Sequence, residues 1–248
     1  MFADKYAGSK QLILRESFPE LSRSLIMVSF ELYPYAGMKY NSAEHKWHHP
    51  NGSIVEFGYL ESDASVQIYQ SAEYDRILID EATHMSMYRI TYMKSRIRGT
   101  NGFPKQLKLC TNPGGTSHNF LKKRFKIGVN PPNIPFTEYV GRDEFGKDYY
   151  ETRVYIPARV YDNIFLMKKD PNYIKNLMQL PEKEKKALLD GSWDVYEDQA
   201  FPEFDYKIHV CKPFRIPKHW KRWLSVDNGY DDPFAWYWLA VDEFGTVY

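Results

Sequence analysis

The stretch Arg76-Ile77-Leu78-Ile79-Asp80-Glu81-Ala82-Thr83-His84 places three aliphatic residues directly before two adjacent carboxylates. An unbroken apolar run that ends in polar, turn-forming residues is typical of a strand buried on both faces, as in a parallel sheet. Open α/β sheets bind their ligands outside the carboxyl ends of the strands. The pattern therefore predicts a buried parallel strand, with Asp80 and Glu81 at the edge where a ligand would bind.

The same order of residues occurs in the Walker B element of P-loop NTPases. There the first acid helps to hold Mg²⁺, and the second orients or deprotonates the attacking water. The alternative is a buried strand that ends in a solvated Asp-Glu pair. The short motif alone does not separate the two interpretations, so the neighbouring segments must decide.

Composition and charge bound the class of protein. The 248 residues allow one or two domains, and 43% hydrophobic with 26% charged residues is ordinary for a globular chain. The net charge of +1 gives no overall basic signal, so a nucleic acid would need a local patch. Cys110 and Cys211 lack metal or redox spacing, which favours a reducing cytosol. No apolar run approaches the ~20 residues that span a membrane, and no signal-peptide pattern opens the chain.

A second strand is expected beside the acidic one. Gln106–Cys110 has strand composition and runs into Thr111 and Asn112. If the two strands are neighbours in one sheet, this loop brings a hydroxyl and an amide to the edge that carries the acids. The alternative is a simple turn between a strand and a helix.

The segment before the acidic strand is expected to contain a strand, a helix and a hairpin. Lys10–Arg15 has strand composition, and Asn51-Gly52 between two strand-like runs predicts a hairpin. A helix that begins after Ser17 is expected, with the buried face Leu21, Leu25, Val28 and Leu32. A further helix is expected over Ser86 to Arg98.

Three histidines lie in the predicted hairpin. No Cys or Asp has a spacing that would complete a metal site with them, so surface positions are the favoured interpretation. These residues are His45, His48 and His49.

The last forty residues change character. Lys221 to Asp227 reads as a strand that ends in a carboxylate, and a second strand is expected from Phe234 to Val241. Antiparallel strands with an acid at the end of the first suit a metal-dependent nuclease of the RNase H type. A solvated hairpin with ordinary acidic turns is the alternative.

Taken together and in order, these segments resemble the large terminase subunit of tailed bacteriophages, the motor that packages DNA into the prohead. The segments that carry the resemblance are Leu14–Leu21, Pro50–Ser53, Ala72–Thr83, Arg96–Arg98, Thr111–Pro113 with the Ser117-His118 that follows, Asp162–Leu166, Gly191–Trp193, Phe201–Phe204 and Asp227. Each segment alone is only weakly specific for this family, but their occurrence in the family's order makes the resemblance strong.

The resemblance implies a role for five residues. Asp80 is the Walker B acid associated with Mg²⁺ and ATP, and Glu81 is the base that activates water. Thr111 and Asn112 match the coupling motif, which senses the γ-phosphate. Asp227 matches the first metal-binding carboxylate of the nuclease, which uses Mg²⁺ or Mn²⁺.

The resemblance also implies a fold and a division of the chain. The fold class is α/β, a mostly parallel P-loop NTPase sheet of the ASCE type with helices on both faces. A helical linker and the first strands of an RNase H-like domain follow. The expected divisions are a partial ATPase domain over 1–165, a linker over 166–215 and an incomplete nuclease domain over 216–248.

The implied function is ATP-driven packaging of double-stranded DNA with endonucleolytic cutting of concatemers, in the host bacterial cytoplasm and transiently at the prohead portal. The implied partners are double-stranded DNA, the small terminase subunit, the portal and other copies in a ring, with no membrane.

Two departures from the family pattern concern the active sites. No G-x-x-x-x-G-K-[ST] phosphate loop precedes Lys10, where Ala7-Gly8-Ser9-Lys10 has similar letters in another order. The expected further nuclease carboxylates do not occur before Tyr248. Two alternatives stay open: another nucleic-acid-dependent NTPase such as a helicase, and a non-catalytic assembly or DNA-binding subunit.

Overall fold

The computed structural model describes residues 1–170, 172–194, 209–227 and 235–248. The chain forms two compact units, Met1–Gln199 and Ala200–Tyr248. Within the described ranges, no helix has the length and apolar character needed to cross a membrane.

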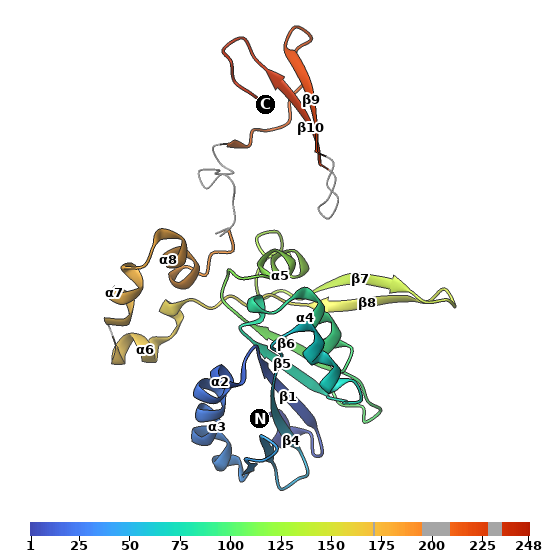
Figure 1. Ribbon diagram of the computed structural model, residues 1–248, viewed down its shortest axis with the longest axis vertical. Helices are drawn as coiled ribbons and strands as arrows, with labels where there is room; N and C mark the ends of the chain where they lie inside the picture. The colour runs from blue at the N-terminus through green and yellow to red at the C-terminus, as the bar shows by residue number, and fades with distance from the viewer. Residues whose placement is uncertain (171, 195–208, 228–234) are drawn as a thin grey trace. The chain divides into compact units, whose positions relative to one another are not determined.

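A six-stranded mixed sheet forms the centre of the first unit, in the order β2-β3-β4-β1-β5-β6. Figure 1 labels its strands β4, β1, β5 and β6. Strands β4, β1, β5 and β6 run parallel, whereas β2 and β3 pair antiparallel at one edge. The predicted strands and the Asn51-Gly52 hairpin are therefore confirmed. The strands are β1 (Lys10–Arg15), β2 (Lys39–Asn41), β3 (Lys46–His48), β4 (Ile54–Tyr59), β5 (Arg76–Asp80) and β6 (Gln106–Cys110).

Helices cover both faces of the sheet because its central strands bury side chains on both sides. On one face Leu12, Leu14, Ile77 and Ile79 pack against α4 (Met87–Lys94) and α5 (His118–Arg124). On the other, Ile13, Val55 and Phe57 belong to one cluster with Leu21 of α2 (Phe18–Leu21). Helix α3 (Met27–Leu32) follows α2 and contacts β3 through Ser29 and Trp47, and Figure 1 shows both helices beside the sheet. The second face of β6 has no such cover among the described residues, and its Gln106, Lys108 and Cys110 are exposed.

The buried face predicted for the first helix is wrong beyond its first turns. Leu21 is buried, but Val28 and Leu32 are 48% and 56% exposed. The cause is a π-helical turn over Ser22–Ile26, which holds one more residue than an α-helical turn. The buried positions therefore move by one, and Ser29 takes the place expected for Val28, where its hydroxyl accepts a hydrogen bond from Trp47 Nε1 at 2.9 Å.

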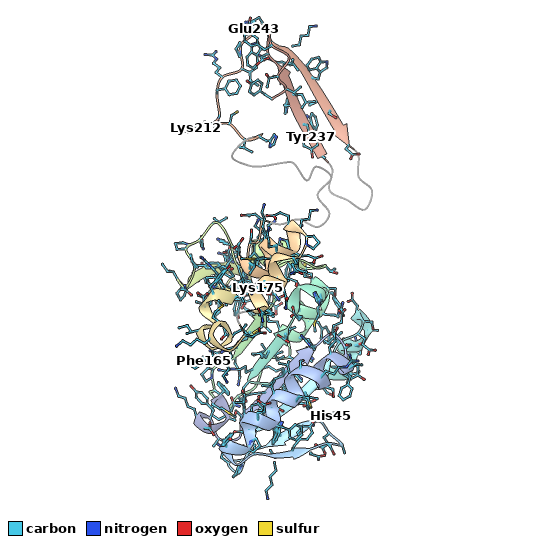
Figure 2. The ribbon with its side chains drawn as sticks, turned by 90° about the vertical axis from the view of Figure 1, so that its left-hand side faces the viewer. His45, Phe165, Lys175, Lys212, Tyr237 and Glu243 are labelled. Carbon is cyan, nitrogen blue, oxygen red and sulfur yellow. The ribbon has the colours of Figure 1, made fainter. Side chains whose placement is uncertain are left out.

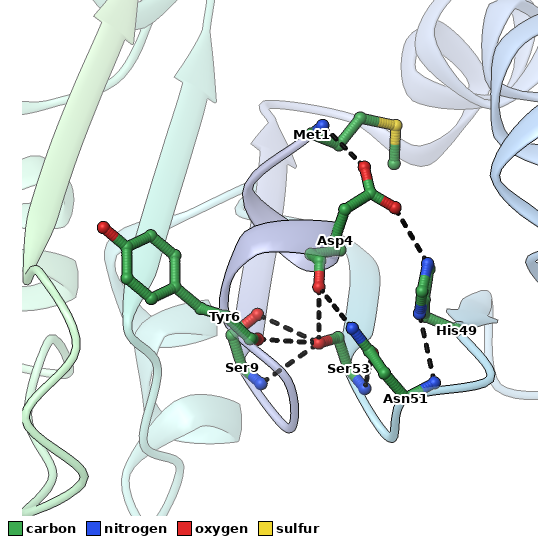
Figure 3. A network of polar contacts seen from close by, with 8 residues as sticks. Met1, Asp4, Tyr6, Ser9, His49, Asn51 and Ser53 are labelled. Carbon is green, nitrogen blue, oxygen red and sulfur yellow. Dashed lines mark hydrogen bonds and ion pairs between the residues drawn. The ribbon is translucent and has the colours of Figure 1, made fainter.

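The N-terminal helix α1 (Phe2–Lys5) is tied to the hairpin loop by a polar network (Figure 3). The Met1 amino group lies 2.6 Å from Asp4, and the other Asp4 oxygen lies 2.9 Å from His49 Nε2. Asn51 and Ser53 donate to the carbonyl of Ala3. His49 thus has a carboxylate partner, and the described residues contain no group of three or more His, Cys, Asp and Glu side chains that could hold a metal ion.

The helix expected over Ser86 to Arg98 ends at Lys94, because the chain then turns back so that Ile97 bridges to Tyr74. A long hairpin follows α5, formed by β7 (Phe136–Arg142) and β8 (Asp148–Arg153). Three short helices complete the first unit: α6 (Ile164–Lys169), α7 (Asn172–Met178) and α8 (Glu182–Leu189). The chain after α8 returns to the core of this unit, where Trp193 is 7% exposed.

The second unit contains an antiparallel pair, β9 (Lys221–Asp227) and β10 (Ala235–Val241). Both strands were expected from the sequence. All of β9 is exposed, as are Trp236, Tyr237 and Trp238 of β10, and Figure 2 labels Tyr237 on this hairpin.

Candidate functional site

Three neighbouring parallel strands end together and bring their last residues to one edge of the sheet. Leu14 of β1 pairs with Ile79 of β5, so Arg15 and Asp80 follow side by side. Asp80 in turn pairs with Cys110, the last residue of β6. The sequence prediction that the acids and the Thr111 loop share one edge is thus met by the strand order.

Arg15 holds the two predicted catalytic acids. Its Nε lies 3.1 Å from Asp80 Oδ2, and its Nη2 lies 3.7 Å from Glu81 Oε1. The remaining terminal nitrogen donates to Ser24 Oγ at 2.9 Å. The guanidinium side chain is only 18% exposed, which strengthens a charge interaction relative to one in open water. Sequence reasoning did not single out Arg15, because its partner strand lies far away in the chain.

Glu81 has a left-handed backbone, with φ 51° and ψ 46°. This region is disfavoured for residues with a side chain, and backbone strain of this kind tends to cluster at functional sites. The conformation ends β5 abruptly and leads into the short 3₁₀ helix Ala82–His84. The Glu81 side chain remains 27% exposed beside Asp80, so it stays accessible to a ligand at this edge.

Thr83 connects the acidic segment to the loop after β6. Its backbone N–H donates to Thr111 Oγ1 at 3.1 Å, and the two hydroxyl oxygens lie 2.7 Å apart. Both hydroxyls also lie within hydrogen-bond distance of the Asn112 carbonyl. The side-chain hydroxyl of Thr111 is therefore used structurally in this state. Thr83 was missed from the sequence, where a threonine after two acids gives no signal of its own.

Gly115 and Ser117 pack directly on the acidic segment. The Ser117 N–H donates to the Thr83 carbonyl at 2.8 Å, and its hydroxyl donates to the Met85 carbonyl at 2.6 Å. Gly115 has φ +79°, and a Cβ there would lie 2.8 Å from the Thr83 carbonyl oxygen. Only glycine fits this approach, so the two loops are held as one body.

A cavity of about 290 Å³ opens beside these loops, and it is lined by Glu81, His84 and Asn112 together with Lys183 and Glu184 of α8. Helix α8 thus forms one wall of the space next to the acids. A space of this size is below that of a typical ligand pocket.

The donor set at this edge suits a shared magnesium site. Mg²⁺ is commonly bound by one or two carboxylates together with substrate phosphates and water, and rarely by protein ligands alone. Asp80 and Glu81 supply two carboxylates, fewer than the three candidate ligands of a site made by protein alone, and the described part of the chain contains no such group of three. The residues therefore fit a metal that arrives with phosphate oxygens.

The Ala7–Lys10 segment lies at the amino-terminal end of β1, the end of the parallel strands opposite to the one that carries the acids. It directly precedes β1, whereas Asp80 follows the carboxyl-terminal end of the neighbouring parallel strand. Ser9 is fully buried, and its N–H donates to Ser53 Oγ at 3.2 Å. This turn therefore does not serve the acids as a phosphate loop.

Asp227 is the last residue of β9 and is exposed. It pairs with Ala235 across the hairpin. Asp231 and Asp232, which follow it in the sequence, fall outside the described residues, as does Phe201–Phe204.

Although Cys110 as a residue is exposed, desolvation of its thiol raises the pKa of that group, the nearby Asp80 charge raises it further, and Lys108 lowers it. The pKa of the Cys110 thiol is therefore expected to change when the charge of Asp80 is removed.

No protein-family model matches this sequence, and no curated protein matches it. Solved structures do match in fold. They include the large terminase of a thermophilic bacteriophage in a second crystal form (TM-score 0.57, 15% identity, 97% of this chain and 54% of that one). The complex of the same terminase with ADP matches with a TM-score of 0.54 and 17% identity, over 97% of this chain and 54% of that one. Its complex with ATP-gamma-S matches with a TM-score of 0.52 and 16% identity, over 97% of this chain and 53% of that one.

This likeness shows a shared fold. The mixed, mostly parallel sheet with its helices is the arrangement found in phage large terminases. The chain spans about half the length of the terminase chains that it matches.

Proposed function

We propose that this chain is part of a large terminase subunit, the ATP-driven motor that packages double-stranded phage DNA. One observation carries the proposal: Arg15, Asp80, Glu81 and the Thr111 loop meet at the carboxyl edge of a parallel sheet. Ligands bind at this edge in open α/β sheets. The fold shared with terminases that were crystallised with ADP and ATP-gamma-S supports the nucleotide as the ligand.

In this proposal each residue has one task in phosphoryl transfer. Asp80 holds Mg²⁺ that arrives with the nucleotide, and Glu81 orients and deprotonates the attacking water. Positioning and charge stabilisation carry most of such a reaction. Thr111 and Asn112 sense the γ-phosphate, because their loop is bonded to the segment that carries the acids.

The remaining assignments follow from the same proposal. Residues 1–165 belong to the ATPase domain, 166–215 to a linker and 216–248 to the start of an RNase H-like nuclease in which Asp227 binds Mg²⁺ or Mn²⁺. The partners are double-stranded DNA, the small subunit, the portal and further copies in a ring, in the host cytoplasm.

The test compares two proteins. The 248-residue chain contains no phosphate-loop motif, so we expect it to hydrolyse little ATP. A protein that joins this chain to a phosphate-binding loop and the further nuclease segment should show DNA-stimulated hydrolysis and metal-dependent cutting. Glu81→Gln should abolish ATP hydrolysis and keep nucleotide binding. Asp227→Ala should abolish DNA cutting and leave ATP hydrolysis in place.

A non-catalytic assembly subunit is the second candidate, and the Arg15 ion pairs favour it because they engage an oxygen of each acid that a metal ion or water would otherwise use. If the extended protein binds DNA but neither hydrolyses ATP nor responds to Glu81→Gln, this second function is correct.

A further inference from the structure

His118 joins two parts of the first unit through its two ring nitrogens. The Gly114 N–H lies 2.9 Å from Nδ1, and a backbone N–H can only donate, so Nδ1 is the unprotonated nitrogen. The proton is then on Nε2, which donates to the Trp193 carbonyl at 3.1 Å. His118 is 6% exposed, so water does not readily replace either partner.

Trp193 receives this bond close to the end of the first unit. Its ring stacks on His118, with 5.0 Å between ring centroids and 24° between planes. Tyr155 contacts it edge-on with centroids 6.4 Å apart. The residue lies shortly before Gln199, where the first unit ends and the second begins.

The other nitrogen of His118 leads back to the acids. Gly114 belongs to the loop that contains Thr111 and Asn112, and that loop is bonded to Thr83. Thr83 closely follows Glu81 in the chain. A short series of direct contacts therefore runs from the acidic pair to Trp193.

We propose that His118 is a positioning residue that couples the Thr111–Gly115 loop to Trp193, near the end of the first unit. If the loop moves, the Gly114 N–H leaves Nδ1 and the ring loses the bond that fixes its orientation. The Nε2–H bond and the stacking on Trp193 then change together. That this coupling serves ATP-driven movement rests on the proposed function.

The test follows Trp193 in the 248-residue protein labelled with 5-fluorotryptophan. The sequence has six tryptophans, and Trp193→Phe identifies the fluorine resonance of Trp193. Thr111→Val removes the hydroxyl that bonds Thr83 and keeps the shape, so the Trp193 resonance should shift. Thr111→Ser keeps the hydroxyl and should leave the resonance in place. A Trp193 resonance that ignores Thr111→Val overturns the proposal.

Two His118 variants each keep one of its bonds. His118→Asn retains an acceptor near Gly114, and His118→Gln retains a donor near the Trp193 carbonyl. In both backgrounds the displacement of the Trp193 resonance caused by Thr111→Val should become at least about twofold smaller. This corresponds to the weakest coupling usually found between residues in contact. The other tryptophan resonances and the melting curve report whether each variant is folded, and either folded variant decides the matter.

Lys122→Ala is the matched control. Lys122 lies on the same helix and pairs with Asp194 at 2.6 Å, next to Trp193, but that contact does not involve the Thr111 loop. The response to Thr111→Val should persist in this variant, and its loss would mean that general packing, not His118, transmits the change.

Adding Mg·ATP-gamma-S to a protein that also carries a phosphate loop separates this inference from the proposed function. Both hold if nucleotide shifts the Trp193 resonance and the shift is lost in His118→Gln. If nucleotide does not bind, the proposed function fails while the Thr111→Val result still decides the coupling.

Discussion

Arg15 Nε lies 3.1 Å from Asp80 Oδ2, across the boundary between β1 and β5. The same guanidinium also approaches Glu81, so its single positive charge is shared between the two adjacent acids. A metal ion that binds Asp80 must compete with this pair, so the state of Arg15 decides how readily the site accepts a cation.

Removing the Arg15 charge should affect both stability and metal affinity. Arg15→Met keeps part of the packing but leaves two partly buried carboxylates unpaired, which should cost about 1–3 kcal/mol of unfolding free energy in urea. The same variant should bind Mn²⁺ more tightly, as followed by electron paramagnetic resonance. Arg142→Met, which breaks the exposed Arg142–Asp148 pair, is the control and should change neither quantity. Equal Mn²⁺ affinity in Arg15→Met and Arg142→Met would show that Arg15 does not compete with the metal ion for Asp80.

The backbone of Glu81 should be a source of strain. Glu81→Gly relieves the left-handed conformation but adds freedom to the unfolded chain, so we expect a net gain of about 0.5–1 kcal/mol in unfolding free energy. Glu61→Gly, at an exposed position without positive φ, should instead lose about 0.5–1 kcal/mol. Chemical denaturation measures both. Two losses of equal size would show that Glu81 carries no strain.

Gly58 should tolerate no side chain as long as Tyr69 keeps its hydroxyl. A Cβ at Gly58 would lie 2.1 Å from Tyr69 Oη and 3.2 Å from a Leu14 methyl carbon. Tyr69 is 6% exposed and cannot swing away, so Gly58→Ala should cost about 1–3 kcal/mol in a thermal or urea melt. The double variant Gly58→Ala, Tyr69→Phe should recover part of this loss. Additive losses in the double variant would refute the predicted clash.

The reactivity of Cys110 should report the charge of Asp80. Because its pKa is raised by burial and by Asp80, less thiolate is present at about pH 8 than in a free cysteine. Asp80→Asn lowers that pKa and should speed alkylation by iodoacetamide in a Cys211→Ser background. Lys108→Gln removes the opposing charge and should slow it. Rates that move in the same direction for both variants would exclude charge as the cause.

Glu151 should make stability depend on acid pH. Burial tends to raise its pKa, but Lys94, Arg153 and Arg124 outweigh this and leave the pKa below its usual value. The unfolded chain therefore binds this proton more readily, so the stabilisation is full above the unfolded pKa and is lost as pH falls through the folded one. Glu151→Gln should cost about 1–3 kcal/mol near pH 7, and the cost should shrink towards about pH 3. Glu138→Gln, with Lys126 as its ion-pair partner, should have a smaller effect. A cost that does not change with pH would assign the effect to packing.

The sequence predicted what depends on local pattern. The strand that ends at Asp80 and the one that ends at Cys110 were identified because apolar runs and turn residues lie next to each other in the chain. Their shared edge followed from parallel pairing. The roles proposed for Asp80, Glu81, Thr111, Asn112 and Asp227 stay predictions.

The contacts that organise the edge could not be predicted, because they depend on which strands become neighbours. Arg15 is near Asp80 only because β1 pairs with β5. Thr83, His118 and Trp193 likewise gain their partners from folding between distant segments. No local pattern in the sequence predicts such contacts.

The π-helical turn over Ser22–Ile26 also affects how related sequences should be aligned. A protein with an uninterrupted α-helix at this place needs one residue fewer to present the same face to the sheet. Its alignment with this chain must therefore open a one-residue gap inside a helix. Without that gap, Ser29, which is bonded to Trp47, would be matched to a solvent position, and the exposed Val28 would be matched to a core one.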